Sequence, residues 1–248
     1  MEEKINPELE AKSVDIAASA MKSAVGMLPT IGPFLSELVG FIIPNQRFDR
    51  IVKYSVELEK KLQTIDNSVI KLALQDENFT ELMEESIRQA ASSVSDERRI
   101  YIASLVKNSL TPEEISFIES KRLLKILGEI NDIEVIWLRF YLCPLLGGDT
   151  EFRKKHENVI KYDRVKISSS QKVIDKEALQ KNYQMHLAQL GLLRPKYDSM
   201  KFNQSILLPI MDFANRGLKI NSYEITPLGS LLIRQIDLNY DYRTNFPK

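Results

Sequence analysis

Apolar residues recur at steps of three and four through most of the first half of the chain, a spacing that predicts amphipathic helices. The clearest stripe runs from about Arg47 to Thr64, where charged residues fill the opposite face. Nothing in residues 14–145 has the pattern of a strand, so this half is expected to be an all-α bundle. Further helices are expected over about Asn67–Gln75, Phe79–Ser92, Glu97–Leu110, Pro112–Leu127 and Ile133–Cys143.

Three of these helices have start signals in the sequence. Ser95-Asp96 supplies a capping side chain to the helix that follows it. Thr111-Pro112 joins a capping hydroxyl to a proline at the first helical position, and two glutamates follow in the first turn. Asp132 is expected to cap the last helix of this half, which holds the only tryptophan, Trp137.

An apolar stretch with only two charges, Ile16–Ile43, precedes the bundle helices. Proline inside a helix removes a hydrogen bond and clashes with the preceding turn. Pro29 and Gly32-Pro33 therefore predict two short helices, about Val14–Met27 and Phe34–Ile43, joined by a turn.

The apolar surface of this hairpin must be buried in the protein core, in a partner or in lipid. Neither arm has the roughly 20 apolar residues that one membrane-spanning helix needs. Burial in the core is the default interpretation, and a hairpin that enters a membrane only when triggered is the alternative. The contact residues in each case are Leu28, Phe34, Leu38 and Ile42.

The final third of the chain has a different pattern. A polar, basic linker with at most one short helix, about Asp149–Ile160, is expected over residues 147–172. A helix is predicted over Lys176–Leu190, and Gly191 is expected to end it in a left-handed cap.

Strand-like residues follow this helix. Leu192-Leu193 is expected to be extended, and two longer runs, Ser205–Phe213 and Lys219–Ile225, precede a helix that starts at Thr226-Pro227. Helix, short strand, hairpin and helix in this order resemble a winged helix. The helix Ile133–Cys143 is a candidate first helix of the same module.

The chain has no net charge, yet its two halves differ. Residues 1–146 carry 17 Lys/Arg and 23 Asp/Glu, a balance of −6, and residues 147–248 carry 17 and 11, a balance of +6. Opposed halves indicate a helical bundle domain over 1–146 and a winged-helix-like domain with a small β-hairpin over 173–248. The basic half indicates either an anionic partner or attraction between the two halves. Because most of the expected elements are helices, the expected fold class is mainly α.

Cysteine content and the N-terminus bear on location. The single cysteine, Cys143, allows no internal disulfide and indicates a reducing compartment. The first residues are acidic and polar, unlike a secretory signal. The expected location is the cytoplasm.

A search for reactive or metal-binding patterns finds no active site in the sequence. His156 and His186 match no metal-ligand spacing, and Cys143 is expected to be a buried structural thiol. Gly147-Gly148 lacks the strand and the Lys-Ser/Thr of a phosphate loop. The chain is therefore expected to be non-enzymatic, without metal or cofactor. An enzyme with an unrecognised site would require the cysteine and both histidines to converge in one pocket.

The C-terminal module carries the candidate binding surface. In a winged helix the helix before the wing enters the major groove, and basic residues contact phosphate. Many such modules bind only proteins, so a protein partner and DNA both remain open. The candidate contacts are Lys176, Lys181, Asn182, His186, Arg194, Lys196, Arg216 and Lys219.

Five segments carry a family resemblance: Ile42–Arg47, Glu85–Ile87, Ser95–Arg99, Ala103–Leu110 with the Pro-Glu-Glu that follows, and Tyr223–Gly229. Together they resemble the abortive-infection alpha family of bacterial phage-defence proteins. The resemblance implies a bacterial cytoplasmic protein that acts as an accessory or effector in defence. None of these segments carries a known reaction, so no catalytic residue is transferred.

The leading hypothesis is thus a non-enzymatic interaction or effector protein of phage defence, which acts through partner or membrane contact. The alternative is a winged-helix DNA-binding transcriptional regulator. A homodimer through the apolar stripe of Arg47–Thr64 is a further hypothesis, and burial of that stripe within the bundle explains it equally well.

Overall fold

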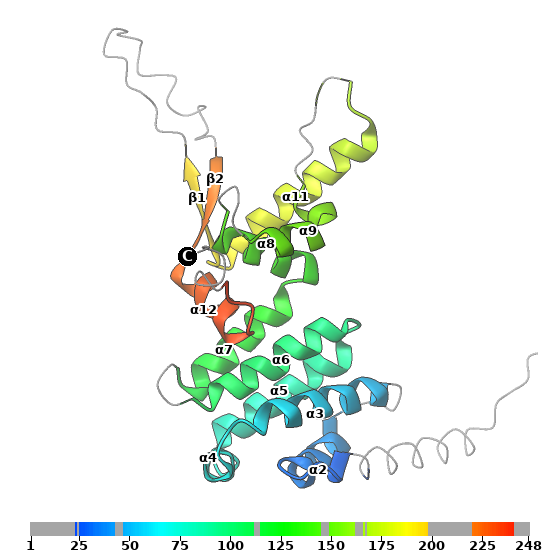
Figure 1. Ribbon diagram of the computed structural model, residues 1–248, viewed down its shortest axis with the longest axis vertical. Coiled ribbons are helices and arrows are strands. Elements are labelled where there is room, and N and C mark those ends of the chain that lie inside the picture. The colour runs from blue at the N-terminus through cyan, green and yellow to red at the C-terminus, as the bar shows by residue number, and fades with distance from the viewer. Residues whose placement is uncertain are drawn as a thin grey trace, which may run out of the picture. The chain divides into compact units, whose positions relative to one another are not determined.

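The computed structural model describes Ser23 and residues 25–42, 47–111, 115–144, 149–161, 166, 168–197 and 220–240, with the backbone alone given for 38–42. Within these residues the protein is mainly α-helical with a small antiparallel pair of strands, as the sequence predicts (Figure 1). The chain divides into two compact units. The first comprises the part up to Glu129 together with Arg234–Leu238, and the second comprises Ile130–Ile233 and the residues from Asn239.

The first unit is a helical bundle. Its helices are α2 (Gly32–Ile42), α3 (Phe48–Leu62), α4 (Asn67–Ala73), α5 (Glu77–Ser92), α6 (Asp96–Ser109) and α7 (Phe117–Glu129). Helix α3 packs against α5 and α6, and α5 also packs against α6 and α7. The apolar stripe of α3, which includes Ile51, Leu58 and Leu62, is buried by these contacts. The stripe considered for dimerisation is therefore covered within the unit itself.

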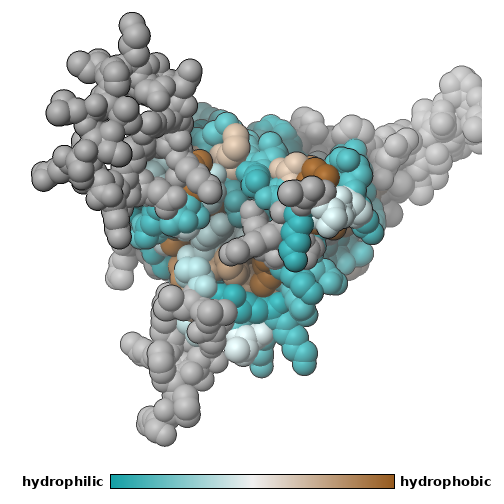
Figure 2. All heavy atoms as spheres, turned by 90° about the horizontal axis from the view of Figure 1, so that it is seen from above, coloured by the Kyte–Doolittle hydropathy of each residue, from teal (hydrophilic) through white to brown (hydrophobic). Residues whose placement is uncertain are grey.

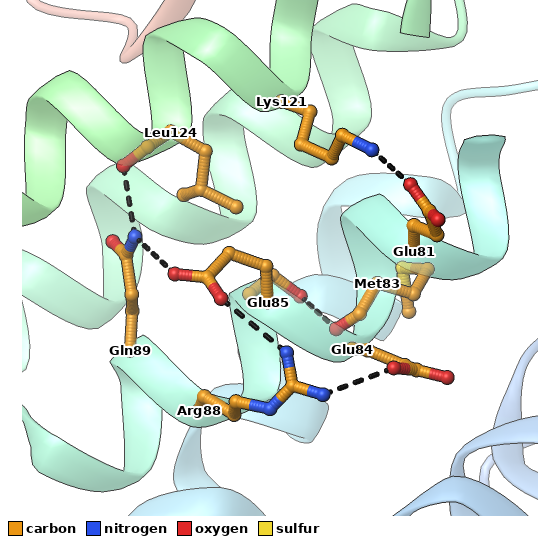
Figure 3. A network of polar contacts seen from close by, with 9 residues as sticks. Glu81, Met83, Glu84, Glu85, Arg88, Gln89, Lys121 and Leu124 are labelled. Atoms are coloured by element: carbon orange, nitrogen blue, oxygen red, sulfur yellow. Dashed lines mark hydrogen bonds and ion pairs between the residues drawn. The ribbon is translucent and has the colours of Figure 1, made fainter. Parts of the chain in front are cut away.

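Polar side chains join α5 to α7 at the edge of this core (Figure 3). The Gln89 side-chain amide donates to the Leu124 carbonyl of α7 (2.9 Å) and to Glu85 on its own helix (2.9 Å). Lys121 of α7 forms an ion pair with Glu81 of α5. These polar contacts fix the position of α7 along α5, which apolar packing alone would leave less specific.

Capping side chains begin three of these helices. Asp66 accepts a hydrogen bond from the Ser68 amide (2.7 Å) at the start of α4, and Asp76 does the same for α5. Ser95 Oγ accepts from the Arg98 amide (3.0 Å) at the start of α6, as predicted. Each side chain satisfies an amide that has no partner within its own helix.

Helix α7 begins at Phe117, so the predicted start at Pro112 was wrong. Residues 112–114 lie outside the described part of the chain, but Ile115 and Ser116 are not helical. Ser116 Oγ accepts from the Glu119 amide (3.3 Å), and the Glu119 carboxylate accepts from the Ser116 amide (2.8 Å). This reciprocal capping box starts the helix later than the proline signal implied.

The turn of the apolar hairpin is tied to α3 by a buried carboxylate. Glu59, only 4% exposed, accepts from the backbone amides of Thr30 (3.1 Å) and Ile31 (3.3 Å) at the start of α2. Val25, Ile31 and Leu35 are buried. Most of the arm predicted over 14–27 lies outside the described residues.

The second unit combines helices with the pair of strands. Its elements are α8 (Asp132–Leu142), α9 (Thr150–Lys155), α10 (Glu157–Ile160), α11 (Gln171–Gln189), β1 (Leu193–Tyr197), β2 (Ile220–Ile225) and most of α12 (Pro227–Gln235). Helix α11 packs against α8 and β1, and β2 packs against α8. Because α8 makes these contacts, the boundary between the units lies at Glu129 rather than at 146.

Strand β1 follows α11 directly and pairs antiparallel with β2, with Leu193 opposite Ile225. The run Ser205–Phe213 lies outside the described residues. Gly191 ends α11 with φ +74°, the left-handed cap that the sequence predicts. The Thr226 hydroxyl donates to the Gly191 carbonyl (2.7 Å) and accepts from the Gly229 amide (3.0 Å), so it joins the turn between α11 and β1 to the start of α12.

Three local predictions for this unit were wrong. The segment 147–172 holds two short helices, α9 and α10, where at most one was expected, and α11 begins at Gln171 instead of Lys176. Asn131, not Asp132, caps α8: its side chain accepts from the Glu134 amide (3.0 Å) while Glu134 accepts from the Asn131 amide (2.8 Å). Asn131 is the cap rather than the neighbouring Asp132 because its hydrogen bonds with Glu134 are reciprocal and close a capping box.

Candidate functional site

Helix α11 is the element on which the sequence placed the binding surface. Its buried side includes Gln180, Gln184 and Leu187. The opposite face is exposed and carries Asp175, Ala178, Asn182, Met185 and Gln189. These five residues are one acid, two amides and two apolar side chains, while Lys172 and Lys181 are also exposed on the same helix.

The predicted basic contacts on α11 are held by acids of the same unit. Lys181 Nζ lies 2.7 Å from Glu177 Oε1, one turn away on the same helix. His186 Nδ1 lies 2.6 Å from Glu134 Oε1 of α8, and that carboxylate is only 3% exposed. Lys176 is half-buried, and Asn182 is exposed.

The basic residues of β1 share one carboxylate of β2. Arg194 Nη2 lies 3.3 Å and Lys196 Nζ lies 3.1 Å from Glu224 Oε2. Hydrogen bonds from Lys196 and then Arg194 lower the pKa of Glu224 below its usual value, and the two positive charges lower it further. The carboxylate therefore stays ionised and offsets part of the charge that the strands present. Arg216 and Lys219 lie outside the described residues.

The hairpin contact residues fall into two groups. Leu28 and Phe34 are half-buried. Leu38 and Ile42 belong to α2, but their side chains lie outside the described part of the structure. No described helix is both long and apolar enough to cross a membrane.

The cysteine and the histidines have separate partners in the described contacts. The Cys143 carbonyl accepts from Arg153 Nη2 (2.9 Å), the His156 ring packs on Phe152, and the His186 ring meets Glu134. Among the described residues there is no cluster of three or more His, Cys, Asp or Glu side chains that could hold a metal ion. The carboxylate that meets His186, that of Glu134, also caps α8.

The acids that pair with the basic residues were missed at the level of sequence. Glu134 had a readable signal, because an asparagine three residues before it makes a capping box. Glu177 had one too, since it precedes Lys181 by four residues on a helix. Glu224 had none, because its pairing depends on the register of two strands that are distant in sequence. Trp137, which lines a pocket between α8, α11 and β2, was noted only as a unique residue.

Comparison of the chain with protein-family models, with curated proteins and with solved structures finds no match to any of them.

Proposed function

We propose that the protein is a non-enzymatic interaction protein of bacterial phage defence, and that it docks a protein partner through the exposed face of α11 and the adjoining strands. The observation that carries this proposal is the pairing of the predicted basic contacts with acids. Lys181, His186, Arg194 and Lys196 each lie within ion-pair distance of a carboxylate.

Pairing of this kind favours a protein partner over nucleic acid. DNA binding draws most of its affinity from lysine and arginine that neutralise phosphates. An ion pair has little field beyond about 10 Å at moderate salt, so paired cations attract a polyanion weakly. The exposed face of α11 instead offers apolar and amide side chains, which suit a protein surface.

Hydrophobic groups on the surface support the same choice. Met185 is 48% and Leu179 is 54% exposed on α11, and Tyr197 is 50% exposed on β1. On the face of the molecule seen in Figure 2, hydrophobic areas lie in small patches between hydrophilic ones. Mixed surfaces of this composition are typical of non-obligate protein interfaces.

Partner contact is also favoured over membrane contact for the apolar hairpin. Val25, Ile31 and Leu35 are buried, and the Glu59 carboxylate holds the turn that joins the arms. Insertion into lipid would require these side chains to leave the first unit and would leave a buried carboxylate without its amides. The resemblance to the abortive-infection alpha family supports the defence context of the proposal.

Plating efficiency of a phage panel on a bacterial host that expresses the chain tests this function. We expect at least one phage to form about tenfold fewer plaques, and we expect Ala178→Arg to abolish the protection because it places a charge in the centre of the exposed face of α11. Arginine has nearly the helix propensity of alanine, so the substitution leaves the helix intact.

Two controls accompany this variant. Val94→Arg adds the same charge to an exposed position of the first unit, 82% accessible, and should keep protection. Cys143→Ala should also keep it, because a non-enzymatic protein needs no thiol. Protection that survives Ala178→Arg, or that is lost in Cys143→Ala, would contradict the proposal, as would a chain that protects against no phage in the panel.

The second candidate is a winged-helix DNA-binding regulator. The observation that favours it is the order of α8, α11, β1 and β2, in which a long helix leads directly into an antiparallel pair. This order supports a winged-helix-like arrangement with α11 as its recognition helix. A salt-sensitive shift of duplex DNA by the full chain would favour this candidate over a protein partner.

A further inference from the structure

The second unit contains a pocket of about 400 Å³. It is lined by residues of α8, α10, α11 and β2. Volumes of roughly 300–1,000 Å³ are typical of small-molecule sites. Since all of its walls belong to one compact unit, the pocket is a feature of that unit alone.

Aromatic rings form the main wall of this pocket. Trp137 and Phe140 meet edge to face at 5.6 Å, and Phe140 and Tyr141 do so at 5.4 Å along α8. Tyr223 of β2 continues the wall, with its ring 6.3 Å from that of Tyr141. Aromatic rings bind flat, apolar molecules through offset or edge-on contacts.

The indole N–H of Trp137 is a hydrogen-bond donor without an acceptor among the described residues. The residue is only 2% exposed, and its Nε1–H is buried without an acceptor among the described residues. A tryptophan N–H that is buried normally finds a partner, because a donor removed from water without one destabilises the fold. An acceptor carried by a ligand would supply that partner.

The remaining lining residues limit the ligand's charge and shape. Ile160, Met185 and Ile220 are apolar, while Gln184, Asn221 and Ser222 add neutral polar groups. Lys181 also lines the pocket, but its ammonium pairs with Glu177, so the site carries little net charge. Partial burial, followed by the nearby Tyr197, raises the pKa of Tyr223, which keeps its phenol neutral at physiological pH.

We propose that this pocket binds an uncharged, planar heteroaromatic molecule of about two fused rings whose ring nitrogen or carbonyl oxygen accepts the hydrogen bond of Trp137 Nε1. The pocket shares Met185 of α11 and part of β2 with the docking face of the proposed function, but ligand binding there does not depend on that function. The ligand is recognised by stacking on the rings of α8 and β2 and by a single hydrogen bond.

Binding of three bicyclic probes to the full chain tests the proposal. Quinoline and isoquinoline carry a ring nitrogen acceptor at different positions, and naphthalene has the same shape without one. Trp137 is the only tryptophan, so its fluorescence reports directly on the pocket. We expect saturable quenching by at least one of the two nitrogen heterocycles, with an affinity at least fivefold tighter than that of naphthalene.

Three variants separate the pocket from non-specific binding, with saturation-transfer NMR on the probes as the readout. Trp137→Phe removes the donor and should reduce the preference for a nitrogen heterocycle over naphthalene to less than twofold. Met185→Trp fills the pocket from α11 and should abolish binding of all three probes. Leu179→Trp adds the same bulk to α11 outside the pocket and should leave binding unchanged.

Equal affinity for naphthalene and both heterocycles in the natural chain would overturn the role of the indole N–H. Probe binding that survives Met185→Trp, or no saturable binding of any probe, would overturn the pocket itself. Because Met185→Trp leaves the aromatic wall in place, the test remains decisive even if Trp137→Phe unfolds the second unit.

Discussion

At the scale of single residues, the most informative groups are glutamates. Glu59 holds the hairpin turn, Glu134 caps α8 and meets His186, and Glu224 pairs with two cations of β1. A buried carboxylate is costly unless hydrogen bonds or a cation compensate it. Glu59 and Glu134 are buried, so each marks a place where the fold requires one arrangement of its neighbours, whereas Glu224 is partly exposed.

Glu59 gives a prediction for the stability of the first unit. Glu59→Ala leaves the amides of Thr30 and Ile31 without an acceptor, and we expect a loss of about 2 kcal/mol in the free energy of unfolding, measured by urea denaturation. Glu59→Gln retains one acceptor oxygen and should lose about half as much. Glu57→Ala, on the same helix, is the matched control and should change stability by less than about 0.5 kcal/mol.

Hydrogen exchange locates the effect of Glu59. In Glu59→Ala the amides at the start of α2 should exchange faster than those of α6, because the hairpin turn opens locally before the bundle unfolds. Unchanged stability together with unchanged exchange at Thr30 and Ile31 would show that the carboxylate does not hold the turn.

At the scale of elements, periodicity located the helices, and local capping decided where they start. The stripe of α3 and the cap of α6 could be read directly, because both depend on residues close in sequence. The start of α7 could not, since two competing signals, the proline at 112 and the Ser116–Glu119 box, lie within one short segment. The pairing of β1 with β2 could not be read either, because 22 intervening residues carry their own strand-like pattern.

Gly229 tests the junction between the strands and α12. A Cβ at this position would lie 2.3 Å from the Leu192 carbonyl oxygen, a backbone atom that cannot rotate away. We expect Gly229→Ala to destabilise the second unit by about 2 kcal/mol, because overpacking forces the backbone to shift. The measurement is thermal unfolding followed by circular dichroism.

Gly26→Ala is the control for that substitution. The nearest atoms to a Cβ at Gly26 are 3.9 Å away, so the new methyl group has room. Replacing a helical glycine by alanine should be neutral or stabilising by about 0.5 kcal/mol. Equal effects of the two substitutions would show that α12 does not pack as closely on the end of β1 as the structure indicates.

At the scale of the whole molecule, the sequence showed that charge is divided between the two halves, but not how it is used. The excess of lysine and arginine in residues 147–248 indicated either an anionic partner or attraction between the two halves, and only the structure shows which of these cations face acids. Lys181, Arg194 and Lys196 all do. The balance of +6 over that half therefore includes these three cations, each of which lies beside an acid.

The Trp137 pocket illustrates a second limit of the sequence. Its walls come from four elements separated by up to about ninety residues, so no short segment of the sequence indicates it. The sequence predicted a helix over Ile133–Cys143, which holds the aromatic residues of the main wall. Only the packing of α8 against α11 and β2 shows that a cavity remains beside them.

The most direct test of the central claim, that paired cations make the face of α11 and the strands a protein surface rather than a phosphate-binding one, is a titration of a fluorescent duplex with the full chain at low salt. We predict no saturation at concentrations on the order of 10 µM, where non-specific DNA binders saturate, and a weak, salt-sensitive gain of binding in Glu224→Gln, which releases Arg194 and Lys196. Saturable binding by the natural chain, with an affinity that falls steeply as salt is raised, would contradict the account.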